Sequence, residues 1–154
     1  MIRLARESDI PEIEALLRQV GQVHHDIRPD IFCQGCQKYD APALAELLTD
    51  ETRPIFVAVE HNAVAGYCFC MLKKFDNQAV STPHTEIYID DLCVDAQHRG
   101  RGIATKLYRY VLDYAKSLGC QFVTLNVWQG NDNAMAFYEK MGLTPRNITL
   151  ETKV

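Results

Sequence analysis

Two closely spaced glycines join a predicted strand to a predicted helix, and this junction is the strongest indication of chemistry in the chain. Residues 94–105 read Val-Asp-Ala-Gln-His-Arg-Gly-Arg-Gly-Ile-Ala-Thr. Apolar residues before the junction are typical of a strand, and those after it recur at the three-to-four spacing of a helix with one buried face. Glycine permits backbone conformations that a Cβ would block, so amide N–H groups at the start of that helix can point outward. Such donors, at the positive end of a helix dipole, attract phosphate.

The surroundings of the glycines exclude the two common nucleotide loops. A dinucleotide fingerprint needs a third small residue where Thr105 stands, and a Walker loop needs Gly-Lys-Ser/Thr where residues 105–107 read Thr-Lys-Leu. Residues 97–102, Gln-His-Arg-Gly-Arg-Gly, instead match the pattern Gln/Arg-x-x-Gly-x-Gly/Ala. This pattern resembles the acetyl-CoA pyrophosphate loop of the GCN5-related N-acetyltransferase superfamily.

A second motif lies downstream, in residues 131–143, which read Asn-Asp-Asn-Ala-Met-Ala-Phe-Tyr-Glu-Lys-Met-Gly-Leu. It resembles the superfamily pattern Asn-x-x-Ala-x-x-Phe/Leu-Tyr-x-x-x-Gly-Phe at every fixed position except the last, where Leu143 replaces the usual aromatic residue. Two independent motifs in the expected order argue against chance agreement. The resemblance is good over residues 85–143, and before residue 85 only the order of elements agrees.

The resemblance implies a sheet that is splayed between its fourth and fifth strands, with the co-substrate acetyl-CoA in the gap and no metal. The fourth strand would be 85–94, and a bulge near its end would free backbone groups to hold the pantetheine arm. The phosphates would lie on the loop and on the start of the helix. The cofactor-binding residues that the resemblance implies are Leu92, Cys93, Val94, Gln97, Arg99, Gly100, Arg101, Gly102, Ile103, Ala104, Thr105 and Asn131.

The family's chemistry is direct transfer from a thioester to an amine, which needs a base for the amine and an acid for the leaving thiolate. Tyr138 matches the position of the general acid, and a phenol with a pKa of about 10 is protonated at neutral pH. A packing role for this tyrosine stays open. Asp90 matches an acidic position of polyamine-acetylating members and is the expected base, with Glu86 as the alternative. Successive residues on a strand point to opposite faces, so at most one of Asp90 and Asp91 should face the amine. Structural ion pairs for these acids also stay open.

The acceptor site is expected near residues 22–40, an irregular stretch that is rich in aromatic and histidine residues. The expected acceptor is the primary amine of a small molecule, such as a polyamine, an amino acid or an aminoglycoside. Two alternatives are transfer to a protein N-terminus or lysine, and a sensor that binds acetyl-CoA or CoA without transfer. The acceptor residues that the resemblance implies are His25, Asp30, Phe32, Glu86 and Asn126, each of which also fits a packing or surface role.

The order of predicted elements indicates an α/β domain with a mixed sheet of about six to seven strands and helices on both faces. A crossover through a helix makes the strands on either side of it parallel, whereas the tight turn at 61–62 makes its neighbours antiparallel. One domain is expected over residues 1–154. The predicted strands are 2–5, 54–60, 63–72, 85–94, 120–128 and 148–153, and the predicted helices are 8–20, 41–49, 101–118 and 131–141.

Composition limits the partners and the location of the chain. Hydrophobic residues make up 47% and charged residues 23%, the balance of a soluble globular protein. A net charge of -4 argues against nucleic acid as a partner. No apolar run has the roughly 20 residues of a membrane helix, and no signal peptide is recognisable, so a cytoplasmic location is expected. Relatives are often homodimers, although no residue pattern here indicates a self-complementary surface.

Cysteines at positions 33 and 36 form a Cys-x-x-Cys motif in the polar stretch. A structural zinc site would need a second pair of ligands, and a redox pair would be expected at the start of a helix that follows a strand. Neither condition is met, so we expect Cys33 and Cys36 to be ordinary loop residues.

Overall fold

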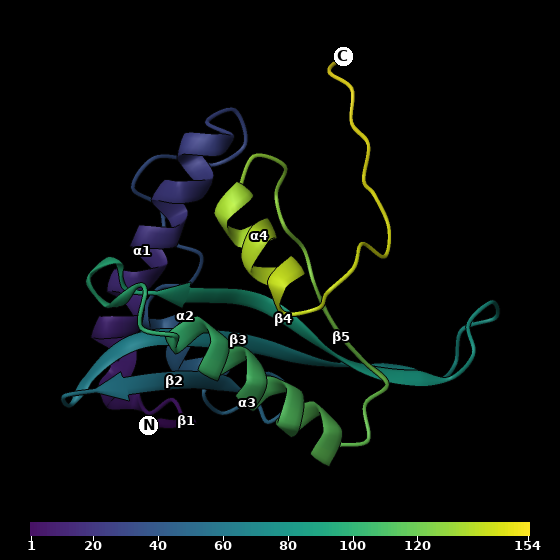
Figure 1. Ribbon diagram of the computed structural model, residues 1–154, viewed down its shortest axis with the longest axis horizontal. Helices are drawn as coiled ribbons and strands as arrows, with labels where there is room; N and C mark the ends of the chain where they lie inside the picture. The colour runs from purple at the N-terminus through teal and green to yellow at the C-terminus, as the bar shows by residue number, and fades with distance from the viewer.

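The computed structural model describes residues 1–154 and contains one mixed five-stranded sheet in the order β1-β2-β3-β4-β5 (Figure 1). The pairs β1–β2, β2–β3 and β3–β4 are antiparallel, and the pair β4–β5 is parallel. The prediction of a mixed sheet is therefore confirmed. The strands are β1 (Ile2–Leu4), β2 (Ile55–Glu60), β3 (Ala63–Phe75), β4 (His84–Val94) and β5 (Phe122–Leu125).

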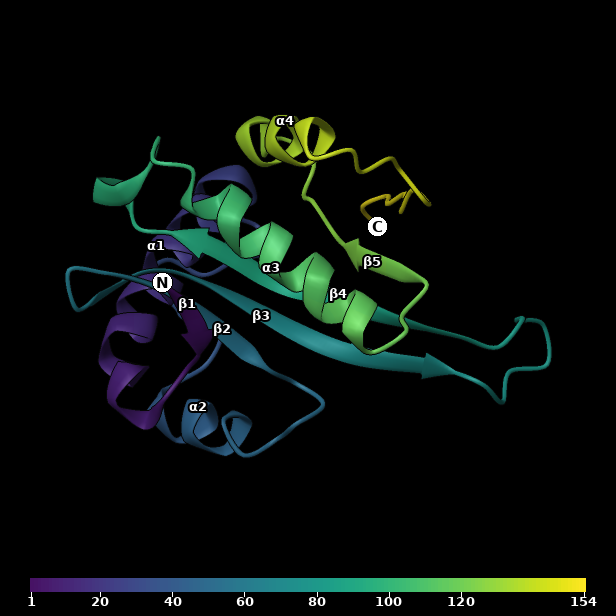
Figure 2. The ribbon, with the colours of Figure 1, turned by 60° about the horizontal axis from the view of Figure 1, so that its bottom comes forward.

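Helices cover both faces of the sheet, as predicted, and Figure 2 shows the two layers on opposite sides of the strands. One face packs against α1 (Ile10–Ile27) and α2 (Ala41–Leu47), in a cluster that includes Tyr67 and Phe69 of β3. The other face packs against α3 (Ile103–Ser117) and α4 (Asp132–Lys140), in a cluster that includes Cys68 of β3. Short 3-10 turns precede α1 (Glu7–Asp9) and lie in the glycine loop (Ala96–His98).

The sheet has fewer strands than the six to seven predicted, because residues 148–153 do not form one. Ile148 and Leu150 are 81% and 88% exposed, and no backbone hydrogen bond involves a residue after Leu143. The alternating pattern is correct for an extended chain, but a strand also needs a neighbouring edge to supply hydrogen bonds. Within one copy of this chain, the segment 144–154 pairs with no strand edge.

Helix α1 is longer than predicted, because it passes through Gly21 and ends at Ile27. A Cβ on Gly21 would lie 2.5 Å from the carbonyl oxygen of Cys36, so this glycine allows the following loop to lie against the helix. The expectation of ordinary loop cysteines is also wrong, because Cys33 and Cys36 form a disulfide in that loop.

Candidate functional site

Strands β4 and β5 separate part of the way along the sheet. Their pairing runs from Glu86–Phe122 to Ile89–Leu125 and stops there, whereas β4 continues to Val94. Beyond Ile89, the edge of β4 that faces β5 has no strand partner, and Figure 1 shows the chain after β5 turning away toward α4. The predicted splay between these two strands is present.

A β-bulge marks the same point on β4. Cys70 of β3 pairs with Ile89, and Phe69 pairs with Asp91. Asp90 is therefore an extra residue in β4 that has no partner on β3. A bulge interrupts the alternation of side chains along a strand. Asp90 accepts a hydrogen bond from Tyr39, and Asp91 accepts one from Tyr67. Both tyrosines pack in the cluster beneath α1 and α2, so both carboxylates lie on the same face of the sheet. The regular alternation, on which the prediction that at most one of them faces the amine was based, is therefore absent here.

The Asp90 carboxylate is held by two side chains from the loop before α2. Lys38 Nζ donates to Oδ1 at 2.7 Å, and the Tyr39 hydroxyl donates to Oδ2 at 2.8 Å. The same hydroxyl accepts a hydrogen bond from Arg53 Nη2 at 3.0 Å. Burial and the neighbouring Asp90 raise the pKa of Tyr39 to about 12, so its proton stays on oxygen. Sequence reasoning did not identify Lys38, because 52 residues separate it from Asp90.

The neighbouring Asp91 has a carboxyl group that titrates near neutral pH. Burial raises the pKa of Asp91 to about 6, although the hydrogen bond from Tyr67 opposes this change. A group that titrates near the working pH is suited to proton transfer. Asp91 was weighed with Asp90 as an acidic pair, but its burial depends on packing that the sequence does not display.

Replacing Asp91 with asparagine should remove a pH dependence of stability. The pKa of Asp91 in the folded chain exceeds the usual value of about 4. The contribution of the protonated Asp91 carboxyl to the free energy of unfolding is therefore fully present below about pH 4, and it is lost as the pH rises through about 6. We expect the free energy of unfolding of the wild type to fall by up to about 3 kcal/mol relative to Asp91→Asn across this window. Urea titrations of both proteins at several pH values measure this difference, and parallel pH curves would contradict it.

Glu86 is buried, and its carboxylate already accepts hydrogen bonds from other residues of the chain. Its side chain accepts from Arg146 Nη1 at 2.9 Å and from Thr124 Oγ1 at 3.2 Å, and the residue is 5% exposed. Asn126 lies just beyond β5 and donates to the Tyr88 hydroxyl at 3.2 Å. The structure therefore gives Glu86 a structural ion pair and places Asn126 beside the opening of the sheet.

Of the three acceptor residues expected near 22–40, His25 and Phe32 are in contact, whereas Asp30 is paired with Arg28. His25 lies on α1, and its Nδ1 is 2.7 Å from the carbonyl oxygen of Phe32. Asp30 is bonded to Arg28, which lowers the pKa of Asp30 to about 2. The Phe32 ring contacts Trp128, with ring centroids 5.0 Å apart. Phe32 thereby contacts the segment that follows β5.

The glycine loop forms a hollow of about 220 Å³ at the start of α3. Gly100 and Gly102 have φ angles of 76° and 74°, which side chains rarely adopt. The first main-chain bond of the helix runs from Lys106 N to Gly102 O, so the three preceding N–H groups have no backbone acceptor. Free N–H groups at a helix start are suited to anions. The hollow is lined by Val94, His98, Arg99, Gly100, Gly102, Ile103, Ala104, Thr105 and Phe137.

Gln97 and Arg101 do not line the hollow, and Arg99 lines it while also contacting the chain. Gln97 is exposed on the 3-10 turn. Arg101 lies 3.7 Å from Glu60, and Arg99 Nε lies 3.4 Å from the carbonyl oxygen of Val94, which indicates contacts within the chain for both arginines. Asp95 anchors the loop by accepting from Gln19 at 2.9 Å.

Helix α4 contributes two aromatic residues, Phe137 and Tyr138, to the site. Its Phe137 lines the hollow, and its Tyr138 has a pKa that is raised chiefly by burial. No hydrogen bond within the chain involves the Tyr138 hydroxyl, which leaves its proton available. Asn131 caps this helix, since its side chain accepts from Ala134 N at 3.4 Å.

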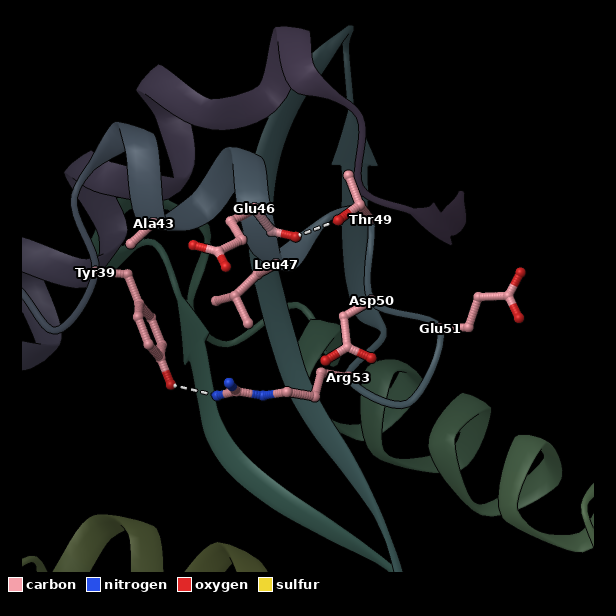
Figure 3. A pocket seen from close by; sticks show the side chains of 8 residues that line it. All are labelled: Tyr39, Ala43, Glu46, Leu47, Thr49, Asp50, Glu51 and Arg53. Carbon is pink, nitrogen blue, oxygen red and sulfur yellow. Dashed lines mark hydrogen bonds between the residues drawn. The ribbon is translucent and has the colours of Figure 1, made fainter.

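A larger hollow, of about 670 Å³, lies beneath α2 and behind Tyr39 (Figure 3). Figure 3 shows Arg53 reaching the Tyr39 hydroxyl from the other side of this hollow. This hollow shares Tyr39 with the carboxylate pair but contains no residue of the glycine loop.

The chain has no group of three or more histidine, cysteine, aspartate or glutamate side chains that could hold a metal ion. None of the helices combines the length and the apolar character that a membrane-spanning helix requires.

Comparisons with known proteins agree with this geometry. Thialysine N-epsilon-acetyltransferase from Bos taurus is 36% identical, over 92% of this chain and 82% of that protein. N-alpha-acetyltransferase 30 from Schizosaccharomyces pombe is 37% identical over 56% of this chain, which spans about half (55%) of that relative. The crystal structure of a mutant BH1408 protein from Bacillus halodurans superposes with a TM-score of 0.95 at 27% identity, covering 100% of this chain and 99% of that one.

A family model provides the most direct assignment. The model of the Acetyltransferase (GNAT) family matches residues 20–143, which include the opened edge of β4, the glycine loop and α4. This match and the Bos taurus relative, which is similar over nearly the whole chain, lead to the same conclusion. The chain belongs to the GNAT family of acetyltransferases.

Proposed function

We propose that this chain is an acetyl-CoA-dependent N-acetyltransferase that acts on the primary amine of a small molecule. The observation that carries the proposal is the opening between β4 and β5. Its edge ends at the glycine hollow, and the bulge in that edge presents the Asp90 and Asp91 carboxylates. A donor site for an anionic cofactor and an acceptor site for a cation thus adjoin along one strand.

The glycine loop fits the phosphates of acetyl-CoA, because its free N–H groups face a hollow with room for them. The residues proposed to hold the cofactor are those of the hollow, together with the backbone of 92–94 for its arm, on the edge of β4 that β5 leaves without a partner. Bound acetyl-CoA supplies the acetyl group as an activated thioester. Arg99, Arg101 and Gln97 have secondary roles in this proposal, and Asn131 positions α4 as its cap.

Two side chains handle protons in the proposed reaction. Asp90 accepts a proton from the acceptor's ammonium group, because it stands at the bulge and has Tyr39 to fix its orientation. Tyr138 donates a proton at the leaving sulfur, because its raised pKa keeps the hydroxyl protonated. Asp91 is a second candidate for the base, favoured by its pKa of about 6. Glu86 is a weaker candidate, because Arg146 and Thr124 occupy its oxygens.

The expected acceptor is a small amine, and relatives support this expectation. Proteins named thialysine N-epsilon-acetyltransferase match over 92% of this chain in two mammals. The relative named for N-alpha-acetylation matches 56% of it, which is weaker support for a protein N-terminus as the acceptor. A cofactor sensor without transfer would not need a carboxylate at the bulge.

A panel of amines tests this function. The purified chain is mixed with acetyl-CoA and, in turn, with diamines, polyamines, lysine analogues, aminoglycosides and lysine-containing peptides, and thiol release is recorded. We expect release with at least one small amine and little with peptides. Comparing the pH profiles of Asp90→Asn and Asp91→Asn then identifies the base. Tight CoA binding without release by any amine would favour the sensor, and release by peptides alone would favour the protein acetyltransferase.

The proposal includes a second copy of the chain as a partner. The segment 144–154 is extended, exposes Ile148 and Leu150, and has no main-chain hydrogen bonds, while β5 lies at the edge of the sheet. A free strand-forming segment and a free edge on the same chain allow two copies to exchange segments symmetrically.

Charging the apolar face of this segment should separate the copies. We expect wild type to be a dimer by light scattering and the double variant Ile148→Glu, Leu150→Glu to be a monomer, because its charges would be buried at the exchanged strand. Thr149→Glu places a charge on the opposite face of the segment and is the matched control. A monomeric wild type at high protein concentration would exclude the exchange.

A further inference from the structure

A lysine of this chain forms an ion pair with the carboxylate that the proposed acceptor must reach. Lys38 Nζ lies 2.7 Å from Asp90 Oδ1, and the Lys38 side chain is 46% exposed whereas that of Asp90 is 10% exposed. The other Asp90 oxygen is bonded to Tyr39, which packs on Phe69 with ring centroids 5.5 Å apart. Asp90 is thus fixed from the protein side and has one oxygen turned toward a half-exposed ammonium group.

Hydrogen bonds of the neighbouring Gln37 fix the loop that carries Lys38, whereas the Lys38 side chain is held only through its ammonium group. Gln37 Nε2 donates to Glu14 at 2.8 Å and to the carbonyl oxygen of Tyr39 at 2.9 Å, and Arg18 donates to Gln37 Oε1 at 2.8 Å. The disulfide between Cys33 and Cys36 closes the preceding turn. The ammonium group of Lys38 has Asp90 as its one ion-pair partner. The side chain can therefore leave Asp90 without any change in the loop that carries it.

From these contacts we infer that Lys38 fills the subsite of the acceptor's ammonium group, and that a cationic primary amine displaces it from Asp90. The inference rests on the proposed function and specifies its substrate class. A primary ammonium group on a flexible alkyl chain is the same chemical species in lysine and in a small alkylamine, so both satisfy the same oxygen. A partly exposed ion pair contributes little stability, so an arriving cation can replace it.

The charges around the subsite agree with a cationic ligand. Asp91 is bonded to the neutral Tyr67 hydroxyl and has no ion pair with a cation. The positive charge of Lys38 opposes the rise in the pKa of Asp91, which places its ammonium near both carboxylates. Arg53 reaches the site only through the Tyr39 hydroxyl, on the side of the hollow in Figure 3. When Lys38 moves away, two adjacent carboxylates are left for the amine.

Binding measurements test the displacement without requiring turnover. Putrescine is titrated by calorimetry into wild type, Lys38→Met and Lys38→Arg, each saturated with CoA. If Lys38 occupies Asp90 about nine-tenths of the time, its removal should tighten putrescine binding about tenfold, because apparent affinity scales with the competent fraction. Lys38→Arg keeps a competing cation and should bind no more tightly than wild type. In an Asp90→Asn background, the effect of Lys38→Met should disappear.

A purely structural role for Lys38 predicts different results. In that case Lys38→Met would weaken putrescine binding and lower the melting temperature, and either unchanged or weaker binding would overturn the inference. With the best acceptor of the amine panel, the inferred role also predicts a KM about tenfold lower with kcat within about twofold of wild type. If wild type binds putrescine but releases no thiol with any amine, the proposed function fails while the binding comparison still decides the role of Lys38.

Discussion

Replacing Gly102 with valine is expected to weaken acetyl-CoA binding by at least about 100-fold, a loss of nearly 3 kcal/mol. Gly102 has a φ of 74°, where a residue with a Cβ is strained by roughly 1–2 kcal/mol. Relief of this strain would rotate the peptide planes that follow and turn away the free N–H groups of the helix start. No atom lies within 4 Å of the position a Cβ would take, so the core should remain intact.

The chain offers a matched control at the other end of the same helix. Gly119 follows α3, has a φ of 71° and likewise has no atom within 4 Å of a Cβ. Gly119→Val should cost similar stability and leave acetyl-CoA affinity within about twofold of wild type, since it does not line the hollow. Calorimetry with acetyl-CoA and thermal unfolding measure both effects. If Gly102→Val retains affinity, the glycine loop does not hold the phosphates.

Replacing Tyr138 with phenylalanine should reduce kcat by about 100-fold or more, the usual contribution of a positioned general acid. The KM for acetyl-CoA should change little, because Tyr138 does not line the glycine hollow. Since the pKa of Tyr138 is raised above its ordinary value, the wild-type hydroxyl should keep its proton throughout the alkaline range of the assay. Steady-state kinetics across this range measure both parameters.

Tyr110→Phe removes a hydroxyl from a tyrosine on the outer side of α3 and serves as the control. Tyr110 is 40% exposed and packs on Phe56, so kcat should be unchanged. Equal turnover by Tyr138→Phe and wild type at every pH would show that Tyr138 is a packing residue and not the acid.

The glycine loop and its helix could be predicted because their information is local. Gly100, Gly102 and the apolar spacing of 103–117 lie in one short stretch, and the conformations they require are properties of those residues. The antiparallel and parallel pairing from β2 to β5 followed for the same reason, since the connections between these strands are short or contain one α-helix, whereas the connection from β1 to β2 contains both α1 and α2. Local signals also located Asn131, which caps α4.

The arrangement around Asp90 could not be predicted, because it depends on contacts between distant segments. The bulge arises from the register of β4 against β3, and it turns Asp90 and Asp91 to the same face against the usual alternation. Lys38 reaches this face from a loop whose position depends on α1 continuing past Gly21. A helix-breaking glycine alone does not reveal that another backbone segment lies against it.

The segment 148–153 shows that a local pattern can also predict a strand that the structure does not form. Its alternation predicts a strand, and the chain there is extended, but no edge within the same copy pairs with it. A pattern of residues specifies which face of a strand is apolar, and it leaves open which chain supplies the hydrogen bonds.

The central claim is that the opening between β4 and β5 transfers an acetyl group to a small amine. The most direct measurement counts free CoA and acetylated amine in the same reaction, by thiol titration and mass spectrometry, with and without the amine. The account predicts that both products appear in equal amounts, only when the amine is present, and that Asp90→Asn sharply reduces both. CoA release that is independent of the amine, or CoA binding with no acetylated product from any small amine, would contradict it.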